Sequence, residues 1–347
     1  MLRDVRSPFL RPRLFGVKYN TASNVYTQNT GIGFLKGTSG SSGSAVTTFV
    51  RAFARRGCVV ANASSLDVGN GGFVGGTANT FPQASSHTLV SNNKSGSPTD
   101  GTVHALFLGF DSKEFGRYKK TANVVRSDFD QGHIRAFRIN TTSSTITING
   151  RNATLVKNGT GDVTITLKNT SAAVSLPVVV GTALSATTLI CNTDAVTTTS
   201  FRIKLSNVAG SLTDGIVNIL CLTDDQGTAE RVAATPLMSS QRKPILFGYS
   251  AVYASGAPGY DFNSGDATLV NTATGRVTFT FKEAFRREPI VVAMPIANST
   301  TQTCTIDNSS STAFEVKNWT SGSALANPTD TAGFQLIGIG WDDPSEY

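Results

Sequence analysis

The chain repeats itself, and this repetition constrains its fold more than any other feature of the sequence. Residues 152–167 (NATLVKNGTGDVTITL) and 266–281 (DATLVNTATGRVTFTF) are identical at nine of sixteen positions. Further along, Cys191 in TTLICNTD lies opposite Cys304 in TTQTCTID. Self-similarity at a fixed spacing of roughly 114 residues indicates tandem copies of one folding unit, each long enough for its own core.

A third copy precedes these two. FVRAFARRGCVVA (49–61) aligns without a gap to FKEAFRREPIVVA (281–293), with seven of thirteen positions identical, and DGTVHALFLGFD (100–111) matches DGIVNILCLTDD (214–225). The sequence therefore predicts three tandem units, two linkers and an N-terminal arm. Their expected bounds are 15–115, 130–230 and 244–347 for the units, 116–129 and 231–243 for the linkers, and 1–14 for the arm. Three beads in a row and a pseudo-threefold cluster are both compatible with this division.

Composition and periodicity point to an all-β fold. Charged residues make up only 15% of the chain and there are 33 glycines, while Thr, Ser and Asn are abundant; β-branched residues suit strands, and Gly, Asn and Ser suit tight turns. The alternation in RVTFTF puts Phe279 and Phe281 on one face and Thr278 and Thr280 on the other. About seven short strands per unit, separated by turn signals, predict antiparallel β-sandwiches.

A charged corner, KEAFRRE (282–288), lies between two strands of the third unit. Its charges change in the first copy and are almost absent from the second, while the apolar residues around it persist between the first and third copies. We expect a surface corner held by Phe285 in the core, with Pro289 at the start of the next strand, where its missing N–H does no harm. Arg287, matched by Arg55, is the one corner residue predicted as a contact.

Catalysis finds little support in the sequence. The Ser-rich GTSGSSGSA (37–45) lacks the spacing of a nucleophile elbow. His104 corresponds to Asn218 in the next copy, which favours a half-exposed strand position over a catalytic base. Recurring carboxylates at Asp111, Asp225 and Asp342 favour a turn cap or a contact between units over Ca²⁺ binding or glycosidic chemistry. We predict no enzyme, no cofactor and no metal site.

The four cysteines, Cys58, Cys191, Cys221 and Cys304, have no close spacing. Buried free thiols in a protein that assembles in a reducing cytosol are the expectation.

No run of 18 apolar residues and no signal-like segment is visible, so we expect a soluble protein without an export signal.

The N-terminal arm is the strongest interaction candidate. It combines arginines with large apolar residues and shows neither helical nor strand periodicity. Side chains of these types contribute most at protein interfaces, so we expect the arm to dock on a neighbouring subunit. The net charge of +7 fits a protein partner better than nucleic acid, and no nucleic-acid-binding motif is present. The predicted contacts are Arg3, Arg6, Phe9, Leu10, Arg11 and Arg13.

Aromatic residues of the third unit are a second candidate set. Trp319, Trp341 and Tyr260 stand near Asn and Asp residues, which is the usual composition of a carbohydrate site. Trp341 aligns with Phe110 of the first unit, and this favours a packing role for it instead. Both interpretations stay open at this point.

The third unit resembles a known family. The spacing F-x-x-x-F-x-x-x-P (Phe281, Phe285, Pro289), a later F-x-V and a closing strand that ends in Gly-Trp are similar to H-type lectin-like sandwiches and their relatives in the fibres and baseplates of tailed bacteriophages. Arg-Ser-Pro-Phe-Leu-Arg-Pro is similar to the short docking arms of phage virion proteins. The pattern spans most of the third unit, part of the first and only the flanks in the second.

The resemblance implies a non-enzymatic structural component of a tailed-phage particle, anchored by its arm in a tail, collar or baseplate layer. One alternative is a decoration protein on the capsid, and another is a module that binds host-surface glycans. The implied protein assembles in the host bacterial cytoplasm, resides in the virion, and contacts other virion proteins. We expect a homo-oligomer, with a trimer among the options, and no membrane partner.

Overall fold

The structure is a computed structural model that describes part of the chain. The described residues are 10–20, 25–30, 35–39, 43–49, 58–64, 73–76, 86–93, 99–112, 133–148, 153–168, 176–223, 245–254, 257–263, 267–282, 284–285, 287–296, 302–320, 325 and 333–340. They form 24 strands and no helix, which confirms the predicted all-β class. Both predicted linkers and the start of the arm lie outside the described residues.

The strands fall into three blocks of eight, which we call unit 1, unit 2 and unit 3. Unit 1 contains β1 (Leu10–Asn20), β2 (Val25–Thr30), β3 (Leu35–Ser39), β4 (Ser44–Phe49), β5 (Cys58–Ser64), β6 (Phe73–Gly76), β7 (Ser86–Asn92) and β8 (Thr102–Ser112). Unit 2 contains β9 (His133–Asn140), β10 (Thr145–Ile148), β11 (Ala153–Gly159), β12 (Asp162–Leu167), β13 (Val178–Leu184), β14 (Ile190–Asp194), β15 (Ser200–Ser206) and β16 (Ile216–Thr223). Unit 3 contains β17 (Ile245–Ala254), β18 (Ala257–Asn263), β19 (Ala267–Ala273), β20 (Arg276–Phe281), β21 (Ile290–Ile296), β22 (Gln302–Asp307), β23 (Ala313–Thr320) and β24 (Gly333–Gly340).

All three units have the same topology. In unit 2, four strands have the order β10-β9-β16-β13 in one layer and four have the order β11-β12-β15-β14 in the other, and units 1 and 3 repeat both orders strand for strand. One layer of unit 2 continues into β22 of unit 3, and one layer of unit 3 continues into β6 of unit 1, which makes two eight-stranded sheets. Each unit thus has one strand more than expected. In unit 3 the strand that periodicity missed is β18, APGYDFN, because Pro, Gly and Asp are poor strand formers.

The register follows the repeat as well. Ala153 of β11 pairs with Leu167, and at the equivalent place Ala267 of β19 pairs with Phe281. In β20 the burial pattern confirms the predicted alternation, with Phe279 and Phe281 inside the sandwich. Pro289 directly precedes β21, as predicted.

Phe285 holds the corner between β20 and β21, as the sequence predicted. Its side chain is buried, stacks on Phe247 at a ring-centroid distance of 5.7 Å and meets Phe281 edge-on at 4.7 Å. A Cβ at Gly340 would lie 2.4 Å from the Phe285 ring, so this ring occupies space that only glycine leaves open. The corner is therefore fixed by aromatic packing in unit 3.

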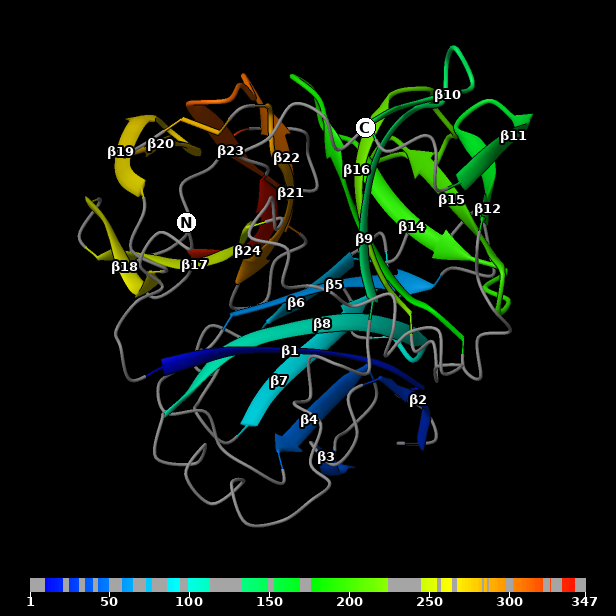
Figure 1. Ribbon diagram of the computed structural model, residues 1–347, viewed down its shortest axis with the longest axis horizontal. Coiled ribbons are helices and arrows are strands. Elements are labelled where there is room, and N and C mark those ends of the chain that lie inside the picture. Colours follow the sequence, from blue (N-terminus) through cyan, green and yellow to red (C-terminus); the bar gives the residue numbers. More distant parts are fainter. Residues whose placement is uncertain are drawn as a thin grey trace, which may run out of the picture.

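The units surround a common centre rather than forming a row (Figure 1). β13 of unit 2 pairs in parallel with β22 of unit 3 through Leu184 and Ile306, and β21 of unit 3 pairs in parallel with β6 of unit 1 through Ile296 and Gly76. β5 of unit 1 meets β14 of unit 2 through a side-chain bond from Asn62. The fifth strand of each unit thus meets the sixth strand of the next in a closed cycle, which is a pseudo-threefold arrangement.

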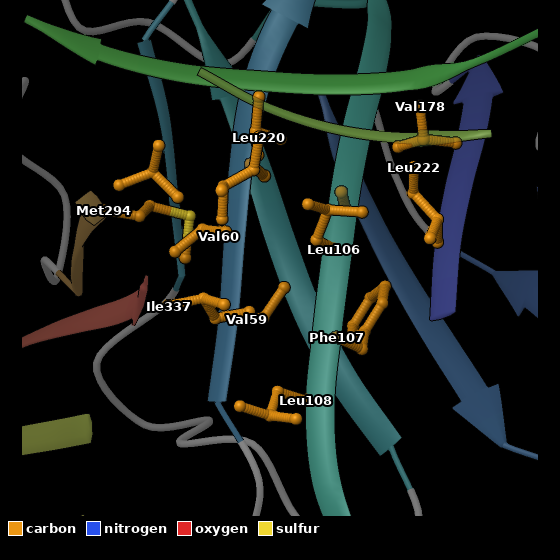
Figure 2. Packing of buried hydrophobic residues seen from close by; sticks show 14 of the residues in the cluster. Val59, Val60, Leu106, Phe107, Leu108, Val178, Leu220, Leu222, Met294 and Ile337 are labelled. Carbon is orange, nitrogen blue, oxygen red and sulfur yellow. The ribbon is translucent and has the colours of Figure 1, made fainter. Parts of the chain in front are cut away.

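One apolar cluster joins the three units at this centre. It contains Val60 and Leu106 of unit 1, Leu220 of unit 2, and Met294 and Ile337 of unit 3 (Figure 2). Units 2 and 3 also have sandwich cores of their own. The units are therefore not independent beads, because a shared core holds them together.

The predicted boundary of the N-terminal arm differs from the structure. Leu10, Arg11 and Arg13, expected in a free arm that docks on a neighbouring subunit, belong to β1 and pair with Ser112, Asp111 and Gly109 of β8. Pro12 between them interrupts the apolar pattern, so periodicity does not predict the beginning of β1. Arg3, Arg6 and Phe9 lie outside the described residues.

Candidate interaction site between the units

The fifth and eighth strands of each unit carry the residues that face the neighbouring units. Because side chains alternate along a strand, residues two apart share a face. Val60, Val180 and Val292 occupy one equivalent position on the fifth strands, and their register partners on the eighth strands are Leu106, Leu220 and Ile337. All six belong to the shared cluster, so they form an apolar layer around the pseudo-threefold axis.

The next inward position on the eighth strands is polar in every unit. His104 of β8, Asn218 of β16 and Gln335 of β24 are each fully buried. Buried polar atoms of this kind require partners, and for one atom of each side chain the partner comes from the neighbouring unit. The position is therefore a candidate for specifying how the units dock.

Each of these polar side chains bonds to the backbone of an equivalent valine in the next unit. His104 Nδ1 accepts from the N–H of Val179 at 3.5 Å. The Nδ2 of Asn218 donates to the carbonyl of Val291 at 3.0 Å.

The third bond closes the cycle. Gln335 Oε1 in unit 3 accepts from the N–H of Val59 in unit 1. Unit 1 thus bonds to unit 2, unit 2 to unit 3, and unit 3 back to unit 1, each time from the eighth strand to the fifth.

A second polar position lies beside the first, on the fifth strands. Asn62 donates to the carbonyls of Gly181 and Cys191, at 3.0 and 2.6 Å, and accepts from the Gly181 N–H at 2.9 Å. At the equivalent place, the Thr182 hydroxyl donates to the carbonyl of Ala293 and accepts from its N–H. The third equivalent residue is Met294, which belongs to the shared apolar cluster instead.

Arg138 adds a charged contact between units 2 and 3. Its Nε donates to Asn218 Oδ1 at 2.8 Å, another nitrogen donates to the carbonyl of Pro289 at 3.3 Å, and the guanidinium forms an ion pair with Glu288. The Arg138 side chain is 7% exposed, so its charge is held largely away from water. A buried charge of this kind depends on its partner.

The ion pair of Glu288 with Arg138 contradicts one prediction about the charged corner, namely that its charges are surface residues. Variation of the corner charges between the copies predicts that they all lie on the surface. Glu288 instead reaches into unit 2, and its partner lies 150 residues earlier in the chain. Variation of a side chain between the copies therefore does not exclude a contact between units at this place.

His104 also differs from its prediction, since it is fully buried rather than half-exposed. Burial, with a smaller contribution from the charge of Lys18, lowers the pKa of its imidazole to about 3. The ring is neutral at pH 7, and its Nδ1 accepts a hydrogen bond from the next unit. This environment suits a structural role.

A cavity of about 30 Å³ lies where the three units meet. That volume is enough for a water-sized molecule, and polar groups line it. Its lining includes Asn62, Thr182, Gln302, Met294, Cys191 and Cys304. Cys191, Cys221 and Cys304 are buried and form no disulfide, as predicted. Burial raises the pKa of Cys191 to about 12 and also raises that of Cys304, so both remain protonated and unreactive as nucleophiles.

The predicted glycan contacts are not gathered into a site by the described residues. Trp319 is 7% exposed, and its indole N–H donates to the Thr305 hydroxyl at 2.8 Å. A sugar-stacking ring needs an open face, and Trp319 does not provide one. Tyr260 lies on β18, where only the backbone is described, and Trp341 lies outside the described residues.

The remaining sequence candidates are placed as follows. Asp111 lies on β8 beside Arg11 in register, while Asp225 and Asp342 are outside the described part of the chain. Within that part, no group of three or more His, Cys, Asp or Glu side chains is placed to hold a metal ion. No helix there is long and apolar enough to cross a membrane.

Sequence reasoning missed the residues that join the units, among them Asn62, Thr182 and Gln335. One signal was present, because His104 and Asn218 align as polar residues within otherwise apolar strands. Their burial became evident only once the neighbouring unit was in place. No protein-family model matches the chain, and no curated protein or solved structure matches it either.

Proposed function

We propose that the protein is a non-enzymatic structural component of a tailed-phage particle, anchored by the start of its chain. The observation that carries this proposal is the cycle of contacts between units. Buried polar side chains at the centre are used to fix three sandwich units against one another, from His104 in unit 1 to Gln335 in unit 3. A rigid body of this kind suits a particle layer or appendage.

The arrangement also suits an assembly with threefold positions. Outward-facing residues at equivalent positions of the units are related by the pseudo-threefold rotation. The exposed Val156 of β11 and Val270 of β19 are such a pair. A tail, collar or baseplate layer is the proposed location. Decoration of the capsid is a variant of the same proposal, and imaging of particles that carry a labelled copy distinguishes the two.

The anchoring part of the proposal concerns residues 1–9. Deletion should stop before Leu10, because β1 pairs with β8 from that residue onward. The expected result is loss of the protein from purified particles, with an unchanged melting temperature. Replacing Arg3, Arg6 and Phe9 by Ser should give the same loss.

The matched control removes positive charge from a connector instead, through Lys119→Ala and Lys120→Ala. This variant should enter particles as the wild type does. If the shortened chain is incorporated normally, the anchoring role of residues 1–9 is wrong. Turnover of host polysaccharide by the purified protein would overturn the non-enzymatic assignment.

A further inference from the structure

The three junctions between units are built from equivalent positions. In each, the polar residue of the eighth strand bonds to the backbone of the equivalent valine on the next unit's fifth strand. The side chain differs each time, as His, Asn or Gln. The bond survives these changes because a strand backbone offers both an N–H and a carbonyl, so either a donor or an acceptor finds a partner.

The junction between units 3 and 1 is the most informative of the three. The last and first units of the chain have no connector between them. This junction nevertheless has a hydrogen bond from Val59 to Gln335 and a parallel strand pairing between Ile296 and Gly76. Side-chain and backbone contacts alone therefore hold it in the same geometry as the junction between units 2 and 3.

We propose that the inward face of each unit is a self-association surface for another unit of the same kind. One chain is then equivalent to a trimer of such units, joined to one another by two connectors. The surface consists of the apolar layer around Val60, Val180 and Val292 and the polar position held by His104, Asn218 and Gln335. Its partner is the fifth strand of the next unit. Three units close the cycle, so one chain leaves no inward face for a second copy.

Two consequences can be measured on the full chain. The intact protein should appear in native mass spectrometry as a monomer of 36.5 kDa. With protease sites placed in the connectors at 116–129 and 231–243, cleavage should yield three fragments that remain together as one 1:1:1 complex. Separation of the fragments after cleavage, or a trimer of intact chains, would overturn the proposal.

Two valines of unit 2 provide a matched pair of variants. Val180→Lys places a charge in the shared apolar layer, and the cleaved complex should dissociate at least tenfold more readily. Val156→Lys places the same charge on an outward position that is 60% exposed, and the cleaved complex should stay intact. Equal behaviour of the two variants contradicts the assignment of the inward face.

A milder variant guards against failure of Val180→Lys to fold. Thr182→Val removes both hydrogen bonds to Ala293 with little change in side-chain shape. It should weaken the cleaved complex and leave the far-ultraviolet circular dichroism of the intact chain unchanged. No change in the association of the fragments would count against the polar part of the surface. These experiments do not depend on incorporation into particles. The self-association proposal can therefore fail while the proposed virion role holds, and the virion role can fail while the self-association proposal holds.

Discussion

The side-chain amide of Asn218 donates a hydrogen bond to the backbone carbonyl of Val291, 73 residues later in the chain and in the next unit. The same side chain accepts from Arg138 within its own unit. Asn218 thus connects a charged group to a neighbouring strand in a place that water does not reach.

Replacing Asn218 by Leu should destabilise the protein by roughly 2–4 kcal/mol, because the Val291 carbonyl and Arg138 both lose a buried partner. Urea denaturation followed by fluorescence measures the change. Thr280→Val is the control, since Thr280 is an exposed strand residue, and its effect should stay within about 0.5 kcal/mol. Equal stability of the two variants would show that the inter-unit bond contributes nothing.

The ion pair between Arg138 and Glu288 gives a second prediction. Glu288→Gln should cost about 1–2 kcal/mol, because the guanidinium is buried while the carboxylate is partly exposed. In a double-mutant cycle with Arg138→Met, the coupling energy should reach at least about 0.5 kcal/mol. Lys282→Gln, on the exposed side of the same corner, should have no such coupling. A coupling energy of zero would show that Glu288 behaves as a surface charge and does not stabilise the contact with Arg138.

Packing around Phe285 gives a third prediction. Gly340→Ala should be strongly destabilising, because the new methyl group would lie 2.4 Å from the Phe285 ring. Phe285→Leu in the same chain should recover part of the loss by making room. Gly159→Ala is the matched control, since no atom lies within 4 Å of a Cβ at that place. Thermal unfolding compares the three variants, and a loss at Gly159 as large as at Gly340 would contradict the packing explanation.

A fourth prediction concerns acid. Burial raises the pKa of Asp162, but hydrogen bonds from Arg202 and Asn158 and the charge of Arg202 outweigh it, so the pKa lies below its ordinary value. Between the two pKa values the unfolded state binds more protons than the folded state. The stabilising contribution is therefore present above about pH 4 and is lost as the pH falls through the lower pKa of the folded protein.

The measurement is a series of urea denaturations from pH 7 to pH 2.5. Asp162→Asn should reduce the fall in stability at the acidic end. Arg202→Met should do the same, because it removes the partner that lowers the pKa of Asp162. Unchanged acid sensitivity in both variants would show that other carboxylates govern it.

Much of each unit could be predicted from the sequence, because strands and turns are local features. The alternation in RVTFTF, the start of β21 after Pro289 and the core position of Phe285 all follow from neighbouring residues, and the structure confirms them. The register of Ala267 with Phe281 repeats that of Ala153 with Leu167, as the internal alignment implies. Two local errors remain, β18 and the beginning of β1, where Pro and Gly hide the strand pattern.

The sequence by itself determined that the chain is all-β and built from repeated units, since periodicity and self-similarity are written along the chain. Only the tertiary structure decided that the units close around one centre. That outcome depends on pairs such as His104 with Val179 and Gln335 with Val59, which lie far apart in the chain and in different units. A polar residue on an alternating strand reads as solvent-facing until a neighbouring unit covers it, and burial between units is a property that no single stretch of sequence carries.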